Sequence, residues 1–193
     1  MTRLFLVADI FGRTPALETI GKRLSEIVPD IGIIDPYQGG DHPFETEAHA
    51  YDYFMRRVGL RKYRSILMNH LASSDPDIVL IGFSVGASAI WAVSGHPPPG
   101  HIKKAFCFYG SQIRQNTDIQ PVFDMELIFP EQEPHFDVDE LIRTLKPKNR
   151  VTCSKAMGLH GFMNEYSPHF DPVCYSTWLT HLETSLIQLR EAK

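Results

Sequence analysis

Short runs of apolar residues alternate with longer amphipathic segments along most of this chain. The apolar runs predict strands at residues 4–8, 31–34, 77–83, 104–109, 125–129 and 151–156. The run at 77–83 is the longest, and it resembles strands that are buried on both faces. We therefore expect a sheet whose central strands have no solvent-exposed side.

The amphipathic segments between these runs predict the helices. Thr14 and Pro15 are a helix N-cap and a first-turn proline, and they open a helix that extends to about residue 28. Further helices are predicted at 45–71 with a break near Gly59, and at 85–94, 138–145 and 172–190.

This alternation of strands and helices is typical of a parallel sheet covered by helices on both faces. A length of 193 residues fits one domain. The sequence contains no internal repeat, no low-complexity tract and no linker that would divide it. We therefore predict a single α/β domain at residues 1–193, with a mostly parallel sheet of about six strands.

Composition excludes several classes of function. A net charge of −4 offers no basic stripe to a nucleic acid. The three cysteines are not spaced as metal ligands, and we predict neither a metal nor another cofactor. No apolar run is long enough to cross a membrane, and the first residues do not resemble a signal peptide. A cytoplasmic protein with reduced thiols is therefore expected.

The most specific local motif is Gly82-Phe83-Ser84-Val85-Gly86, which matches G-x-S-x-G between a buried strand and a helix. In that context the serine sits on a strained strand-to-helix turn with its hydroxyl exposed above the sheet. The motif predicts Ser84 as a nucleophile. The alternative interpretation is a tight glycine turn whose serine only caps the following helix.

A serine nucleophile needs a general base, and nine histidines compete for that role. His160 follows the last predicted strand by a few residues and has glycine at 158 and 161, so its loop can turn back toward Ser84. The acid is expected after the strand at 125–129, where the loop holds Glu131, Glu133 and Asp137. One of these carboxylates would orient His160. Glu133 is the first choice and Asp137 the second.

Several ordered segments resemble the dienelactone hydrolase family over nearly the whole chain. They are Asp9-Ile10-Phe11-Gly12, Asp35-Pro36-Tyr37, the serine motif, Tyr109-Gly110, Pro130-Glu131-Gln132-Glu133-Pro134 and His160-Gly161-Phe162-Met163-Asn164. The resemblance implies the α/β-hydrolase fold in three layers without a cap domain. It also favours Glu133, which occupies the place of the family's aspartate.

The resemblance further implies an oxyanion hole formed by the backbone N–H groups of Ile10 and Val85. It places the Asp9 side chain near the nucleophile. The substrate-pocket candidates are Asp9, Phe11, Tyr37, Tyr109 and Asn164.

Four departures from the family pattern change the expected chemistry. The nucleophile is serine instead of cysteine, and the acid is glutamate behind Pro130, where glycine is usual. Asn164 replaces an arginine that grips the substrate carboxylate, so an anionic diene-lactone is not the expected substrate. The chain also begins at what would be the family's third strand, which implies a reduced sheet.

The leading functional hypothesis is hydrolysis of a small carboxylic ester, lactone or thioester through an acyl-enzyme. No nucleic acid or membrane partner is expected, and the sequence leaves the oligomeric state open. The competing hypothesis is a binding protein that keeps the fold but has lost turnover. A flavodoxin-like nucleotide binder is a weaker third idea, because Gly12-Arg13-Thr14-Pro15 lacks the G-x-G-x-x-G pattern.

Overall fold

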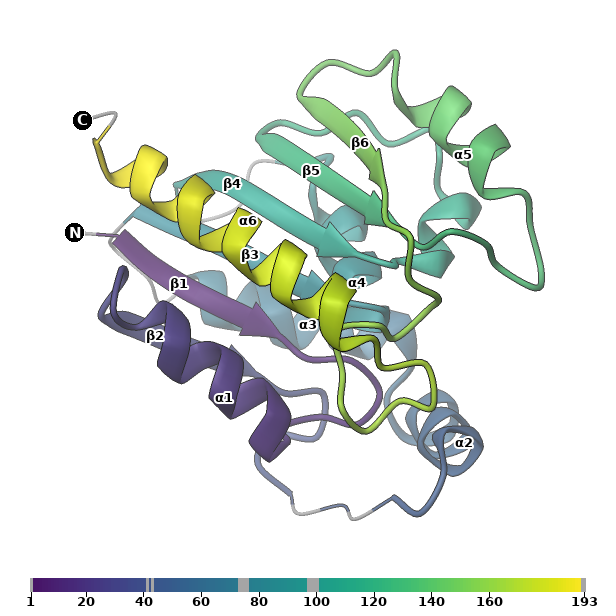
Figure 1. The fold of residues 1–193 in the computed structure, drawn as a ribbon. Helices are drawn as coiled ribbons and strands as arrows, with labels where there is room; N and C mark the ends of the chain where they lie inside the picture. Colours follow the sequence, from purple (N-terminus) through teal and green to yellow (C-terminus); the bar gives the residue numbers. More distant parts are fainter. Residues whose placement is uncertain (1, 41, 43, 73–76, 97–100, 192–193) are drawn as a thin grey trace.

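A computed structural model describes residues 2–40, 42, 44–72, 77–96 and 101–191. Its centre is one sheet of six strands in the order β2-β1-β3-β4-β5-β6, and every neighbouring pair is parallel (Figure 1). The strands are β1 Thr2–Val7, β2 Asp30–Ile34, β3 Asp77–Phe83, β4 Ile102–Phe108, β5 Asp124–Phe129 and β6 Val151–Lys155. The predicted six-stranded parallel sheet is confirmed.

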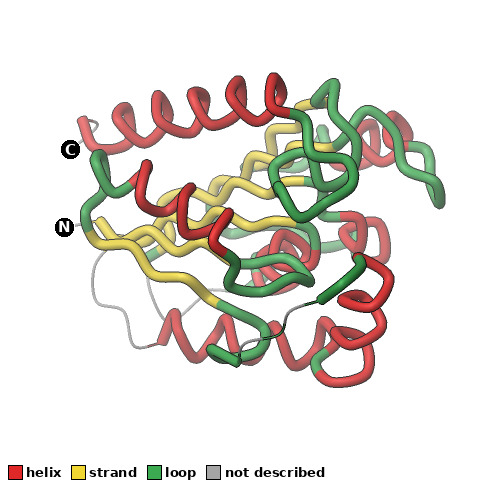
Figure 2. The backbone as a smooth tube through the Cα atoms, turned by 60° about the horizontal axis from the view of Figure 1, so that its bottom comes forward, coloured by secondary structure: helices red, strands yellow, loops and turns green. Residues whose placement is uncertain are grey.

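Helices cover both faces of this sheet (Figure 2). They are α1 Pro15–Leu24, α2 Glu47–Arg57, α3 Gly59–Ala72, α4 Val85–Val93, α5 Val138–Leu145 and α6 Pro172–Glu191. α1 and α6 pack on one face, and α3, α4 and α5 pack on the other. β3 is buried on both sides, as its apolar run predicts, with all residues from Ile78 to Phe83 buried.

The predicted helix at 45–71 is two helices, with the break at the expected place. α2 ends at Arg57, and Gly59 then adopts a φ of +64°, a conformation that favours glycine. Thr14 caps α1 through a side-chain hydrogen bond to the Leu17 N–H group, which agrees with the predicted start of that helix.

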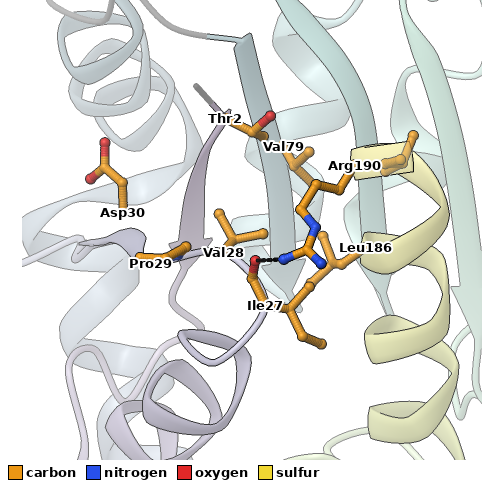
Figure 3. Close-up of a pocket in the computed structure, with 9 residues that line it drawn as sticks. Thr2, Ile27, Val28, Pro29, Asp30, Val79, Leu186 and Arg190 are labelled. Atoms are coloured by element: carbon orange, nitrogen blue, oxygen red, sulfur yellow. Dashed lines mark hydrogen bonds between the residues drawn. The ribbon is translucent and has the colours of Figure 1, made fainter. Parts of the chain in front are cut away.

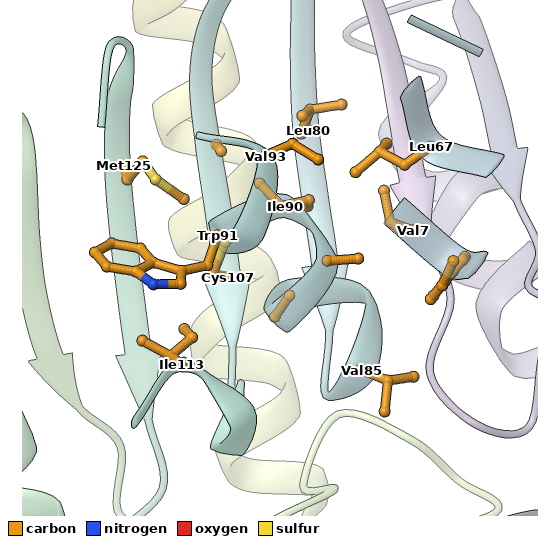
Figure 4. Packing of buried hydrophobic residues seen from close by; sticks show 14 of the residues in the cluster. Val7, Leu67, Leu80, Val85, Ile90, Trp91, Val93, Cys107, Ile113 and Met125 are labelled. Atoms are coloured by element: carbon orange, nitrogen blue, oxygen red, sulfur yellow. The ribbon is translucent and has the colours of Figure 1, made fainter. Parts of the chain in front are cut away.

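One element was not predicted, the short 3₁₀ helix η1 at Ser111–Gln115. It is held by Ile113, which is buried against Trp91 of α4 (Figure 4). The Trp91 indole N–H also donates to the carbonyl oxygen of Asn116 at 2.9 Å. η1 is the only helix or strand between β4 and β5, and all residues in that interval are described.

Because all six strands are parallel, their carboxyl ends lie at the same edge of the sheet. Ser84 follows β3, η1 follows β4, Glu133 follows β5 and His160 follows β6. The segments 9–12 and 35–37 follow β1 and β2 at the same edge. Every candidate residue of the sequence analysis therefore belongs to the loops of one edge.

Candidate active site

The turn at Ser84 is strained in the way that a nucleophile elbow requires. Ser84 has φ +50° and ψ −110°, in the region that non-glycine residues rarely adopt. A methyl group at Gly86 would collide with the carbonyl oxygens of Val7 and Ala8, so α4 can approach β1 this closely only with glycine there. The Ser84 side chain makes no capping hydrogen bond to α4, which leaves its hydroxyl free for another partner.

That partner is His160. The Ser84 Oγ atom lies 2.9 Å from His160 Nε2, and His160 Nδ1 lies 2.7 Å from Glu133 Oε1. An ionised carboxylate can only accept a hydrogen bond, so the Nδ1 atom carries the proton and Nε2 can accept from the serine hydroxyl. Ser84 lies 76 positions from His160 in the sequence, and Glu133 lies 27 positions from it. The three side chains nevertheless form one continuous chain of hydrogen bonds.

The loop after β6 brings His160 to this position. The Glu131 N–H group donates to the Gly158 carbonyl at 2.9 Å, which ties the loops after β5 and β6 together. Gly161 follows the histidine with φ +91°, and a methyl group there would collide with Ser167. The imidazole also packs against the buried Tyr109 ring, with 5.0 Å between ring centroids.

The two candidate acids have different environments. The Glu133 side chain is 6% exposed and faces His160. Asp137 instead caps α5, where one carboxylate oxygen accepts from the Asp139 and Glu140 N–H groups at 2.8 and 3.0 Å. The hydrogen bond from Glu140 is the main cause of a lowered Asp137 pKa. Of the two, only Glu133 lies within hydrogen-bond distance of His160.

Ile10 and Val85 line the same cleft as Ser84 and His160. Among the described residues, neither of their N–H groups has a backbone or side-chain acceptor. Val85 is the first residue of α4, where N–H groups are unpaired and the helix dipole is positive. The two N–H groups are therefore available to an oxygen atom bound beside Ser84.

The cleft itself has a volume of about 430 Å³. One wall is the exposed face of α2, including Tyr51 and Met55, which are 51% and 48% exposed. The remaining lining comes from η1 and the loop after β5, namely Ser111, Gln112, Arg114, Gln115, Glu133, His135 and Phe136. The unpredicted element η1 thus forms part of the site, and no pattern in its five residues distinguishes it from a loop.

None of the five predicted pocket residues lines this cleft. Asp9, Tyr109 and Asn164 instead line a separate cavity of about 10 Å³. Phe11 is buried, at 8% exposure, and the Tyr37 hydroxyl donates to the Ile10 carbonyl. The predicted loops are at the expected edge of the sheet, but these side chains turn inward because they bond or pack within the loops.

A second cavity, of about 170 Å³, includes Thr2 and Asp30, the first residues of β1 and β2, and so lies at the opposite end of the sheet. Figure 3 shows the residues that line it. It is lined mainly by aliphatic side chains such as Val28 and Leu186, and the Arg190 guanidinium donates to the Ile27 carbonyl across it at 3.3 Å. This cavity contains none of the predicted site residues. It has no polar groups arranged for chemistry comparable to those beside Ser84.

Asp9 is a buried carboxylate that accepts hydrogen bonds from two donors. Its Oδ1 atom accepts from the Phe11 N–H group at 2.9 Å, and its Oδ2 atom accepts from the Asn164 amide at 2.6 Å. The Asn164 orientation is fixed because its oxygen accepts from the Tyr166 N–H group. Burial nevertheless dominates, and it raises the Asp9 pKa from 3.8 to about 6.

We expect Asp9→Asn to change how stability depends on pH. The folded protein keeps the Asp9 proton at pH values where the unfolded chain has lost it, so wild-type stability falls as pH rises through the folded pKa. The unfolding free energy of the variant relative to wild type should rise by up to about 3 kcal/mol between about pH 4 and 7.5. Urea denaturation across that range measures this difference, and a constant difference would contradict the raised pKa of Asp9.

The described residues contain neither a metal-binding cluster nor a membrane-spanning helix. No group of three or more histidine, cysteine or acidic side chains there could hold a metal ion. No helix in that part of the chain has the length and apolar character needed to span a bilayer. Its three cysteines are free, and burial raises the pKa of the Cys107 thiol.

Comparison with known proteins relates this architecture to a wider group. No protein-family model matches the sequence. The uncharacterized protein YczH of Bacillus subtilis is 29% identical over 174 residues, which cover 87% of this chain and 84% of that protein.

Solved structures share this fold at low sequence identity. A dienelactone hydrolase-like promiscuous phosphotriesterase from metagenomic libraries has a TM-score of 0.66 at 13% identity, covering 98% of this chain and 87% of its own. A dienelactone hydrolase from Anabaena variabilis has a TM-score of 0.62 at 12% identity, covering 95% and 83%. Together with the parallel sheet and its two helical layers, these similarities show that the chain has the α/β-hydrolase fold with a reduced sheet of six strands.

Proposed function

We propose that this protein is a serine hydrolase that cleaves a small carboxylic ester, lactone or thioester through an acyl-enzyme. The observation that carries the proposal is the continuous hydrogen-bonded chain from Ser84 through His160 to Glu133, with links of 2.9 and 2.7 Å. A nucleophile, a base and an acid in this order are the parts of a catalytic triad.

The proposed first half-reaction forms the acyl-enzyme. Ser84 Oγ attacks the carbonyl carbon while His160 Nε2 takes the hydroxyl proton, and Glu133 stabilises the resulting imidazolium. The N–H groups of Ile10 and Val85 donate to the oxyanion of the tetrahedral intermediate. Collapse of that intermediate breaks the bond to the leaving alcohol or thiol, which receives the proton from His160.

Hydrolysis of the acyl-enzyme completes the cycle, with water in place of Ser84 as the nucleophile. His160 removes a proton from water, which attacks the acyl carbon, and the second tetrahedral intermediate uses the same two donors. Its collapse returns the proton to Ser84 and releases the acid. No metal or cofactor takes part in either half-reaction.

The size of the cleft, its apolar wall and the burial of Asn164 outside it favour a small substrate without a required carboxylate. Asn164, which stands where the related enzymes have a substrate-binding arginine, donates to Asp9 and is only 9% exposed. The cleft of about 430 Å³ suits a compact acyl group. Tyr51 and Met55 offer apolar contacts on one wall.

A fluorophosphonate probe tests the proposal directly, because it reacts with a serine that a base activates. In the reaction the Ser84 oxygen displaces fluoride from phosphorus, and the hydroxyl proton leaves with it. We expect one adduct on the wild-type protein by intact mass, located at Ser84 by peptide mapping, and none on folded Ser84→Ala.

Ser111→Ala is the matched control, since Ser111 lines the same cleft. This variant should be labelled as wild type is. A folded wild-type protein that is not labelled, and that does not hydrolyse short esters, would instead support the binding protein that has lost turnover.

A further inference from the structure

The segment after β1 folds into a tight turn that carries one of the proposed oxyanion donors. The Gly12 N–H group donates to the Asp9 carbonyl at 3.1 Å. Gly12 has φ +73°, and a methyl group there would lie 2.8 Å from both the Asp35 carboxylate and the Tyr37 ring. The turn is therefore packed directly against the loop that follows β2.

Within this turn, the peptide unit between Ile10 and Phe11 is held at both ends. Its carbonyl oxygen accepts from the Tyr37 hydroxyl at 2.5 Å, and its N–H group donates to the Asp9 carboxylate at 2.9 Å. The preceding peptide unit is held at its carbonyl end by Gly12. Of the four polar groups in these two units, only the Ile10 N–H group has no hydrogen-bond partner among the described residues.

Tyr37 is itself rigidly supported. Its own N–H group donates to the Asp35 carboxylate at 3.0 Å. Its ring packs against Phe44 and against Tyr53 of α2, with ring centroids 5.6 and 5.5 Å apart. Burial raises the pKa of the Tyr37 hydroxyl, so it remains a proton donor in the pH range in which enzymes work.

We propose that Tyr37 is a positioning residue for catalysis, whose hydroxyl holds the Ile10–Phe11 peptide so that the Ile10 N–H group stays directed at the oxyanion. This inference rests on the proposed hydrolase function. An oxyanion donor acts only when it lies at the right distance from the developing charge, and loss of a complete donor typically costs about 100- to 1000-fold in rate. Release of the peptide leaves the donor present but poorly placed, so a smaller loss is expected.

The test is Tyr37→Phe, which removes one oxygen atom and keeps the ring. We expect kcat for a short p-nitrophenyl ester to fall by about 10- to 100-fold, with KM within about twofold of wild type. The inhibition constant of a small boronic acid, which forms a tetrahedral adduct on Ser84, should rise by a similar factor. A role in packing alone would change thermal stability and would not produce this split between kcat and KM.

Tyr53→Phe is the matched control, because it makes the same chemical change in a ring that touches Tyr37. This variant should keep kcat, KM and boronate affinity within about twofold of wild type. A second variant, Asp9→Ala, removes the acceptor at the other end of the same peptide and should also lower kcat more than it changes KM. It keeps the proposal testable if Tyr37→Phe does not fold.

The outcomes separate this inference from the proposed function. If the wild-type protein hydrolyses esters and Tyr37→Phe does so equally well, the positioning role is wrong and the proposed function stands. A rise in KM alone would assign Tyr37 to substrate contact and overturn the inference. If the wild-type protein neither turns over esters nor reacts with the fluorophosphonate, the proposed function fails, and the inference that rests on it fails as well.

Discussion

Ser84→Ala and His160→Ala are each expected to lower kcat for short p-nitrophenyl esters by about 10⁴- to 10⁶-fold. The two residues share one proton transfer across a contact of 2.9 Å, so removal of either prevents the same step. The kcat of the double variant should therefore equal, within experimental error, the lower of the two single-variant values. Steady-state kinetics with active-site titration of the wild type measures all three values.

His135→Ala is the control for this experiment, because His135 is another histidine in the lining of the cleft. It should retain kcat within a few-fold of wild type. If His160→Ala kept most of its activity while His135→Ala lost it, a different base would have to serve Ser84. Losses that multiplied in the double variant would mean that the two side chains act in separate steps.

Much of the fold can be predicted from the sequence because local signals and tertiary packing agree. The bounds 77–83 and 138–145 are those of β3 and α5 in the structure. β3 lies inside the sheet between β1 and β4, with both faces covered, and an uninterrupted apolar run is favoured in such a strand. Strand edges differ by one or two residues elsewhere, for example at β1 and β4, because strand ends depend on the pairing partner.

The inward orientation of the Asp9, Tyr37 and Asn164 side chains could not be predicted from local sequence signals. The bond from Tyr37 to the Ile10 carbonyl joins two loops that are 27 residues apart, and the Asn164 bond to Asp9 spans 155 residues. Each residue taken alone has a polar side chain in a loop, which suggests an exposed position. Their burial follows from the adjacency of β1 and β2 and from the return of the loop after β6, which are tertiary features.

The choice between the two candidate acids illustrates a signal that the sequence does contain. Asp137 is followed three residues later by Glu140, the spacing of a helix capping box, and in the structure it caps α5. A residue committed to a helix N-terminus is a poor candidate for orienting a distant histidine. Glu133 has no such local role, and its carboxylate lies 2.7 Å from His160 Nδ1.

Glu133→Gln is expected to lower kcat by about 10³- to 10⁴-fold, with a much smaller change in KM. The amide is nearly the same size as the carboxylate, but it cannot stabilise the imidazolium by its charge. Its NH₂ group can also face His160 Nδ1 and favour the tautomer with the proton on Nε2, which cannot accept from Ser84. Kinetics of ester hydrolysis and urea denaturation of the same preparations separate this effect from a loss of stability.

Asp137→Asn is the matched control, since it makes the same change from acid to amide four residues away. Asparagine is as good a helix cap as aspartate, so α5 should remain intact and kcat should stay within about threefold of wild type. The opposite result, with Asp137→Asn inactive and Glu133→Gln active, would require the loop after β5 to rearrange so that Asp137 reaches His160. Such a rearrangement would have to break the two hydrogen bonds that Asp137 makes to α5 and expose the Glu133 carboxylate, which is now 6% exposed.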